Sequence, residues 1–120
     1  MSRRIALIVE DDPDQAELTQ EMLHSLGFDT AVALNGGQAL DWLVQNKPSL
    51  IILDMRLRFI SGVSVLRQIH TDMTLLDTRV VITTGDLGMA AEYGAQADGV
   101  LIKPFDLAEF RETIRDLFPL

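Results

Sequence analysis

A chain of 120 residues suits one domain with a single core, which we expect to cover residues 1–120, and the absence of cysteine excludes disulfides and cysteine-ligated zinc. The net charge of −8 argues against direct binding to nucleic acid. The apolar run over residues 5–9 is too short for a signal peptide or a membrane span, so we expect a cytoplasmic protein with no membrane contact.

The first half of the chain alternates predicted strands with predicted helices. Residues 5–9 form an unbroken apolar run, typical of a strand that is buried on both faces, and a helical pattern follows it and ends at Gly27. The apolar positions of that helix are Leu18, Met22, Leu23 and Leu26. Residues 30–34 predict a weaker strand, and the polar Asp29 and Thr30 suit the edge of a sheet. Asn35 can cap the next helix, whose expected buried stripe is Ala39, Leu40, Leu43 and Val44.

The second half of the chain continues the alternation. Residues 50–53, 80–83 and 100–102 predict the third, fourth and fifth strands. Ser61 and Gly62 open a helix with apolar positions at Val65, Leu66 and Ile69. A weak, short fourth helix contains Ala90, Ala91 and Tyr93 and is limited by Gly88 and Gly94. Asp106 and Glu109 form a capping-box pattern before the last helix, whose apolar positions are Leu107, Phe110, Ile114, Leu117 and Phe118.

This alternation predicts a parallel sheet with helices on both faces, because right-handed crossovers place each helix over the sheet. The expected fold is therefore a three-layer α/β sandwich. In such a sheet the carboxyl ends of the strands converge on one edge, where ligands bind.

Four short polar segments directly follow predicted strands, and we expect them to meet at that edge. They are Glu10-Asp11-Asp12, Asp54, Thr83-Thr84-Gly85 and Lys103-Pro104-Phe105. Carboxylates gathered at one point repel each other unless a positive charge lies among them, and oxygen ligands around a small hard cation are what Mg²⁺ prefers. The pattern therefore predicts a metal-dependent phosphoryl site. The acids after Val9 also suit a helix N-terminus, with Asp12 or Asp14 as the cap.

The order and spacing of these segments resemble the receiver domain of two-component response regulators. The resemblance covers essentially the whole chain and depends on separated segments in a fixed order, namely Glu10-Asp11, Asp54, Thr84 and Lys103-Pro104-Phe105. It implies a flavodoxin-like fold with five parallel strands in the order 2-1-3-4-5 and five helices.

The resemblance also implies a role for each matched residue. Asp54 is expected to accept a phosphoryl group from a sensor histidine kinase or a histidine phosphotransfer protein. Glu10, Asp11 and Asp54 are expected to hold Mg²⁺ together with the backbone carbonyl of Arg56.

Two further positions complete the implied phosphoryl site. Thr84 is expected to donate a hydrogen bond to a phosphoryl oxygen, with Thr83 as the alternative by register. Lys103 is expected to pair with Asp54 and later with the phosphoryl group, and the peptide bond before Pro104 is expected to be cis.

Several positions depart from the family pattern. Arg58 stands where receivers usually have proline, and Val100 replaces the aromatic residue that usually reports phosphorylation. The segment between Thr84 and Lys103 is also about one helical turn shorter than usual. Arg56 and Asp86 fall at the two variable positions that flank the approach of water, and they could pair across the site.

The leading interpretation is a phosphorylation switch in signal transduction, with an unidentified downstream protein partner and with homodimer formation left open. In this interpretation we expect the protein to catalyse only its own Mg²⁺-dependent phosphorylation and slow dephosphorylation, and not to be an enzyme otherwise. The alternative is a pseudo-receiver that acts as a phosphorylation-independent interaction module, which Arg58 and Val100 favour slightly. A phosphatase with an aspartyl nucleophile ranks last, because Arg56 stands where such an enzyme needs a second acid.

Overall fold

The computed structural model describes residues 3–119, in which strands and helices alternate as predicted. The strands are β1 (Arg4–Val9), β2 (Phe28–Ala33), β3 (Leu50–Asp54), β4 (Arg79–Thr84) and β5 (Gly99–Ile102). The helices are α1 (Pro13–Ser25), α2 (Gly36–Gln45), α3 (Gly62–Thr71), α4 (Leu87–Tyr93) and α5 (Leu107–Leu117). Within residues 3–119, no helix combines the length and the apolar character that crossing a membrane requires.

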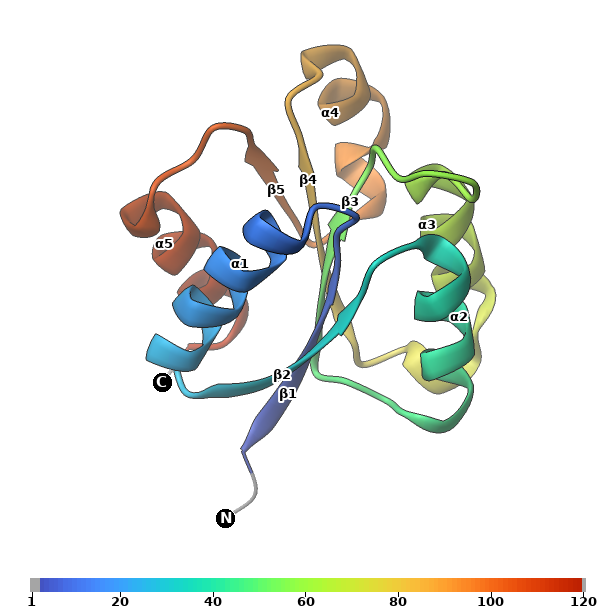
Figure 1. Ribbon diagram of the computed structural model, residues 1–120, viewed down its shortest axis with the longest axis horizontal. Helices are drawn as coiled ribbons and strands as arrows, with labels where there is room; N and C mark the ends of the chain where they lie inside the picture. Colours follow the sequence, from blue (N-terminus) through green and yellow to red (C-terminus); the bar gives the residue numbers. More distant parts are fainter. Residues whose placement is uncertain (1–2, 120) are drawn as a thin grey trace.

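All five strands are parallel and follow the order β2-β1-β3-β4-β5, which confirms the predicted flavodoxin-like fold. Helices α1 and α5 cover one face of the sheet, and α2 and α3 cover the other (Figure 1). The polar β2 is an edge strand, as predicted. The register places Val9 opposite Leu53 and Asp54 opposite Thr83, so the carboxyl ends of the central strands lie side by side.

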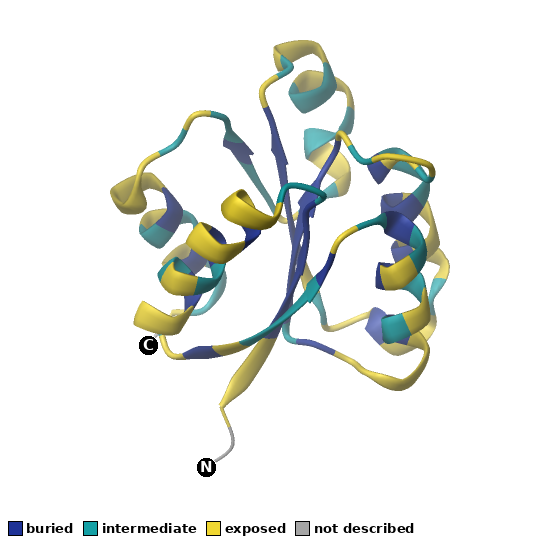
Figure 2. Ribbon diagram, in the orientation of Figure 1, coloured by how far each residue is buried: buried dark blue, intermediate teal, exposed yellow. Residues whose placement is uncertain are grey.

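The core has two halves, because successive side chains of a strand point to opposite faces of the sheet. Buried residues on the α2 and α3 side include Leu7, Val9, Ile51, Leu53, Val65, Leu66 and Ile82. Buried residues on the α1 and α5 side include Ala6, Ile8, Leu23, Ile52, Val81, Phe110 and Ile114. The central strands are consequently buried along most of their length (Figure 2), which explains why their sequences are apolar without alternation.

The predicted helix caps are present. Asp12 caps α1, with its side chain accepting a hydrogen bond from the backbone N–H of Asp14. Asn35 and Ser61 cap α2 and α3 in the same manner, and Asp106 caps α5 by accepting from the N–H of Glu109. Gly27 follows the end of α1 with a φ of 92°, a left-handed conformation that glycine adopts at little cost.

Some sequence predictions were wrong in detail. Strand β2 begins at Phe28 rather than Thr30, because its pairing with β1 already starts where Phe28 lies opposite Arg4. Val44 is 72% exposed and does not belong to the buried stripe of α2. Gly88 lies inside the first turn of α4 instead of limiting it, because Asp86 caps that helix. Two short 3₁₀ helices, Met73–Leu75 and Gly94–Gln96, were not predicted.

Candidate functional site

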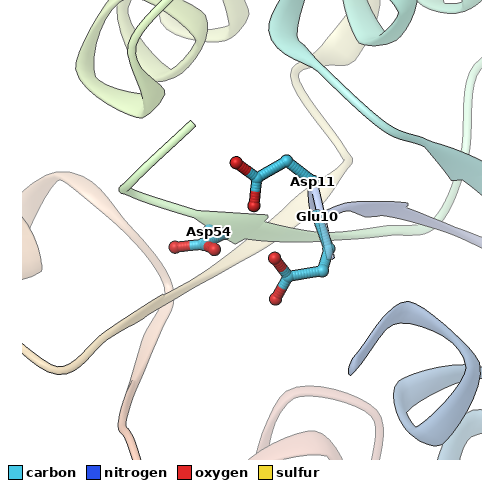
Figure 3. A group of neighbouring side chains, drawn as sticks. All are labelled: Glu10, Asp11 and Asp54. Atoms are coloured by element: carbon cyan, nitrogen blue, oxygen red, sulfur yellow. The ribbon is translucent and has the colours of Figure 1, made fainter. Parts of the chain in front are cut away.

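The predicted carboxylates meet at the carboxyl edge of the sheet. Glu10 and Asp11 directly follow β1, and Asp54 is the last residue of β3. One carboxylate oxygen from each residue lies within 4.8 Å of the others, and Figure 3 shows the three side chains gathered between the two strand ends. Glu10 and Asp54 are each 6% exposed, so the cluster is mostly withdrawn from water.

Backbone hydrogen bonds between neighbouring strands hold the site residues in place. The N–H of Glu10 donates to the carbonyl of Ala33 in β2 at 3.0 Å. The N–H of Met55 donates to the carbonyl of Thr83 at 3.0 Å, and the N–H of Lys103 donates to the carbonyl of Thr84 at 2.9 Å. The functional side chains are therefore carried by the ends of the sheet rather than by free loops.

The ammonium group of Lys103 ties three elements together. Its Nζ donates to Glu10 Oε1 at 3.0 Å, to Gln15 Oε1 at 3.0 Å and to Asp54 Oδ2 at 3.3 Å. A lysine ammonium has three N–H donors, and all of them are used here. The sequence reasoning predicted the contact with Asp54 but missed Gln15, an exposed side chain in the first turn of α1.

Both carboxylate oxygens of Asp54 accept hydrogen bonds. Oδ1 accepts from the backbone N–H of Arg56 at 2.9 Å, and Oδ2 accepts from Lys103. These two contacts fix the orientation of the carboxylate at the end of β3. The peptide bond between Lys103 and Pro104 is cis, as the resemblance implied.

The crowded charges change the protonation of the site. Burial, together with the hydrogen bond and charge of Asp54, raises the pKa of Glu10 to about 7, although Lys103 acts in the opposite direction. Burial disfavours the charged form of Lys103, but the neighbouring Glu10 and Asp54 outweigh that effect and raise its pKa above the usual value. Lys103 is therefore an ammonium at neutral pH, whereas Glu10 exchanges a proton near pH 7.

The two candidate threonines lie on opposite faces of β4. Thr83 lines a groove beside α1 that also contains Glu10, Gln15 and Lys103. Thr84 is 1% exposed, and its hydroxyl oxygen accepts a hydrogen bond from the N–H of Asp86 at 3.0 Å. Because successive side chains of a strand point to opposite faces, Thr84 faces away from the α1 side that Thr83 lines.

Two arginines of the loop after β3 pair with acids around the cluster. Arg56 lies 3.7 Å from Asp86, which is the pairing proposed from the sequence. Arg58 Nε lies 3.7 Å from Asp11 Oδ2, a contact that the sequence reasoning missed. No local sequence pattern links Arg58 to Asp11, because the two residues meet only once β1 and β3 are paired.

The donor set of the cluster fits a small hard cation. Three carboxylates face two basic groups, Lys103 and Arg58, so negative charge is in excess, and oxygen atoms are the ligands that Mg²⁺ prefers. A cation among the three acids would relieve their mutual repulsion. The same cation would offset the charge of a phosphoryl group approaching Asp54.

Comparisons with known proteins find one family along most of the chain. Residues 6–115 match the family described as response regulator receiver domain. Sporulation initiation phosphotransferase F of Bacillus subtilis is 35% identical over an aligned length of 121 residues, and the alignment covers 95% of this chain and 93% of that protein. The DNA-binding response regulator MtrA of Mycolicibacterium smegmatis is 33% identical over 115 residues, covering 96% of this chain but 50% of the regulator. The chain thus spans about half the length of that second relative.

A solved structure with the same fold holds a magnesium ion. The receiver domain of a sensor histidine kinase from Pseudomonas aeruginosa, which contains a magnesium ion coordinated in its active site cleft, superposes with a TM-score of 0.88. The two chains are 26% identical, and the match covers 99% of this chain and 100% of the other.

Proposed function

Since the chain belongs to the response regulator receiver domain family, we propose that it is a phosphorylation switch that accepts a phosphoryl group on Asp54 in a Mg²⁺-dependent reaction. The observation that carries the proposal is the gathering of Glu10, Asp11 and Asp54 within 4.8 Å, with Lys103 hydrogen-bonded to two of them. Incubation with acetyl phosphate and Mg²⁺, followed by intact mass spectrometry, tests it. A phosphoryl-sized gain in mass that EDTA abolishes supports the proposal, and no gain in folded protein contradicts it.

The chemistry assigned to this chain is a phosphoryl transfer to a carboxylate. An oxygen of Asp54 attacks the phosphorus of a phosphohistidine on a sensor kinase or phosphotransfer protein. The new P–O bond forms as the P–N bond breaks, and the leaving imidazole nitrogen keeps the bonding electron pair. In this proposal Lys103, which contacts Asp54, would pair with the transferred phosphoryl oxygens, and the Thr84 hydroxyl would donate a hydrogen bond to them.

Glu10, Asp11, Asp54 and the backbone carbonyl of Arg56 are the groups that would hold Mg²⁺. The bound cation supplies neutralisation of the charge that develops between the nucleophile and the phosphoryl oxygens. The clustering of the three carboxylates supports this assignment, and the magnesium described for the receiver from Pseudomonas aeruginosa agrees with it.

We further propose that the chain works in the cytoplasm as a substrate and switch rather than as an enzyme with a separate substrate. Neither the comparisons nor the complete set of site residues supports the pseudo-receiver alternative. Partners would be a histidine kinase or phosphotransfer protein upstream and another protein downstream. Direct binding to nucleic acid is not expected, because the chain has a net charge of −8, and homodimer formation remains a hypothesis.

The raised pKa of Glu10 predicts that Mg²⁺ binding depends on pH. Below about pH 7 the carboxyl group of Glu10 holds a proton, which must leave before the oxygen can bind a cation. We expect the apparent affinity for Mg²⁺ to rise roughly tenfold between about pH 6 and pH 8 and to level off above that range. Isothermal titration calorimetry at several pH values measures this. The Glu10→Gln protein should bind more weakly and lose the pH dependence, and a flat profile in the wild type would contradict the assignment.

The pair of Arg56 and Asp86 predicts an effect on the lifetime of the phosphorylated form. Arg56 lines the site beside Asp54, and its pair with Asp86 would hinder the approach of water to a phosphoryl group on Asp54. We expect Arg56→Ala and Asp86→Ala each to speed the loss of phosphate about two- to tenfold, measured by mass spectrometry after removal of the donor. Arg79→Ala is the matched control, because Arg79 forms a similar exposed pair with Asp98 at 3.8 Å in another part of the molecule. Unchanged rates in both site variants would exclude the idea.

A further inference from the structure

Arg58 places a second positive group, beside Lys103, against the acidic cluster. It lies in the loop between β3 and α3, and its Nε is 3.7 Å from Asp11 Oδ2. The Arg58 side chain is 81% exposed, whereas that of Asp11 is 25% exposed. The guanidinium therefore approaches the cluster from the solvent side.

The contact divides the cluster between two cations. Lys103 pairs with Glu10 and Asp54 from the interior, at 3.0 and 3.3 Å. Asp11 is the remaining acid, and Arg58 is the cation paired with it. Arg56, which is closer to Asp54 in sequence, pairs instead with Asp86. Among the described residues, each acid of the cluster thus has a basic partner before any metal binds.

We propose that Arg58 is a metal-affinity determinant, a built-in cation that competes with Mg²⁺ for the carboxylate of Asp11. The inference rests on the proposed function, because it concerns the same metal site. Two cations cannot both approach one carboxylate closely without repelling each other, and this repulsion acts against Mg²⁺ as it enters. Arg58 therefore raises the concentration of Mg²⁺ at which the site fills.

The side chain of arginine is a permanent cation, and in Arg58 it lies at the surface. Because Arg58 is highly exposed, its pair with Asp11 adds little to stability, and its replacement is expected to leave the fold intact. The effect is also screened by salt, since the pair lies at the surface.

Calorimetric titration with Mg²⁺ tests the inference in the wild type and three variants, at one pH and at low and high salt. Arg58→Gln removes the charge but keeps a polar chain of similar length, and Arg58→Lys keeps the charge. Arg67→Gln is the matched control, because Arg67 is exposed on α3 and its replacement changes the net charge equally. We expect Arg58→Gln to bind Mg²⁺ about two- to fivefold more tightly at low salt, and the gain to shrink at high salt.

The outcomes separate this inference from the function on which it rests. The inference is supported if Arg58→Gln binds Mg²⁺ more tightly while Arg58→Lys and Arg67→Gln keep the wild-type affinity. That result would show a local effect of the Arg58 charge. Equal or weaker binding by Arg58→Gln overturns the inference while leaving the metal site in place. An equal gain in Arg67→Gln also overturns it, because net charge alone would then explain the change. No Mg²⁺ binding by the wild type would remove the metal site, and the inference with it.

Discussion

We expect the Asp54→Asn protein to take up no phosphoryl group from acetyl phosphate under conditions that modify the wild type fully. The carboxylate of Asp54 is the only nucleophile that the proposed transfer uses, and an amide oxygen cannot replace it. Asparagine has nearly the same shape, and its side-chain oxygen can still accept the hydrogen bond from the N–H of Arg56. The loss should therefore be one of chemistry and not of folding. Intact mass spectrometry measures the fraction of protein that carries the added group.

Two controls make this result decisive. Asp77→Asn changes an exposed carboxylate in the loop before β4 and should leave phosphoryl uptake at the wild-type level. Thermal melting without metal should show that Asp54→Asn is at least as stable as the wild type, because the substitution removes one of three mutually repelling carboxylates. A phosphoryl adduct that persists in Asp54→Asn would mean that another residue is the acceptor.

The second large effect is expected from Gly62→Ala, a change of one methyl group at the start of α3. A Cβ atom at Gly62 would lie 2.5 Å from the Cα of Met55 and 2.7 Å from the carbonyl oxygen of Asp54. Both neighbours are backbone atoms, so the strain cannot be relieved by turning a side chain. Overpacking of this kind typically costs about 1–3 kcal/mol. We expect urea denaturation to show a free energy of unfolding lower by about 1–3 kcal/mol than that of the wild type.

Gly85→Ala is the matched control for this substitution. Gly85 also lies beside the site, but a Cβ there would meet its nearest atoms at 3.9 and 4.0 Å, which is ordinary contact. The free energy of unfolding of the Gly85→Ala protein should stay within about 0.5 kcal/mol of the wild-type value. Because the added Cβ would press on the backbone of Asp54 and Met55, Gly62→Ala should also weaken Mg²⁺ binding, whereas Gly85→Ala should not. Equal stabilities of the two variants would show that the loop yields without cost.

The fold was predictable because the polar residues of the site interrupt the apolar runs where the strands end. Val9 is followed by Glu10, and Leu53 by Asp54, so the boundaries and the shared edge could be inferred together. The start of β2 was harder to place. A polar strand at the edge of a sheet has a weak apolar signal, and Phe28 is buried through its contact with Phe118, far away in sequence.

Helix surfaces were predicted less well than strands. The spacing of Ala39, Leu43 and Val44 gives the apolar side of α2 but not where the buried part of that side ends, and Val44 proved to be exposed. Contacts of long polar side chains were the least predictable. Gln15 meets Lys103 across 88 positions of sequence, and such a contact depends on the finished tertiary structure.

Helix α4 differs from the other four helices in that none of its seven residues is buried. Its apolar contact with the core is limited to half-buried residues such as Met89 and Tyr93, so the free energy of opening this helix should be below that of global unfolding. Helices α3 and α5, which contribute buried residues to the core, would lose much more. Amide hydrogens of α4 should therefore exchange with solvent through local openings, long before those of the central strands. A segment that costs so little to rearrange is the part of the fold that a weak free-energy change at Asp54 could move.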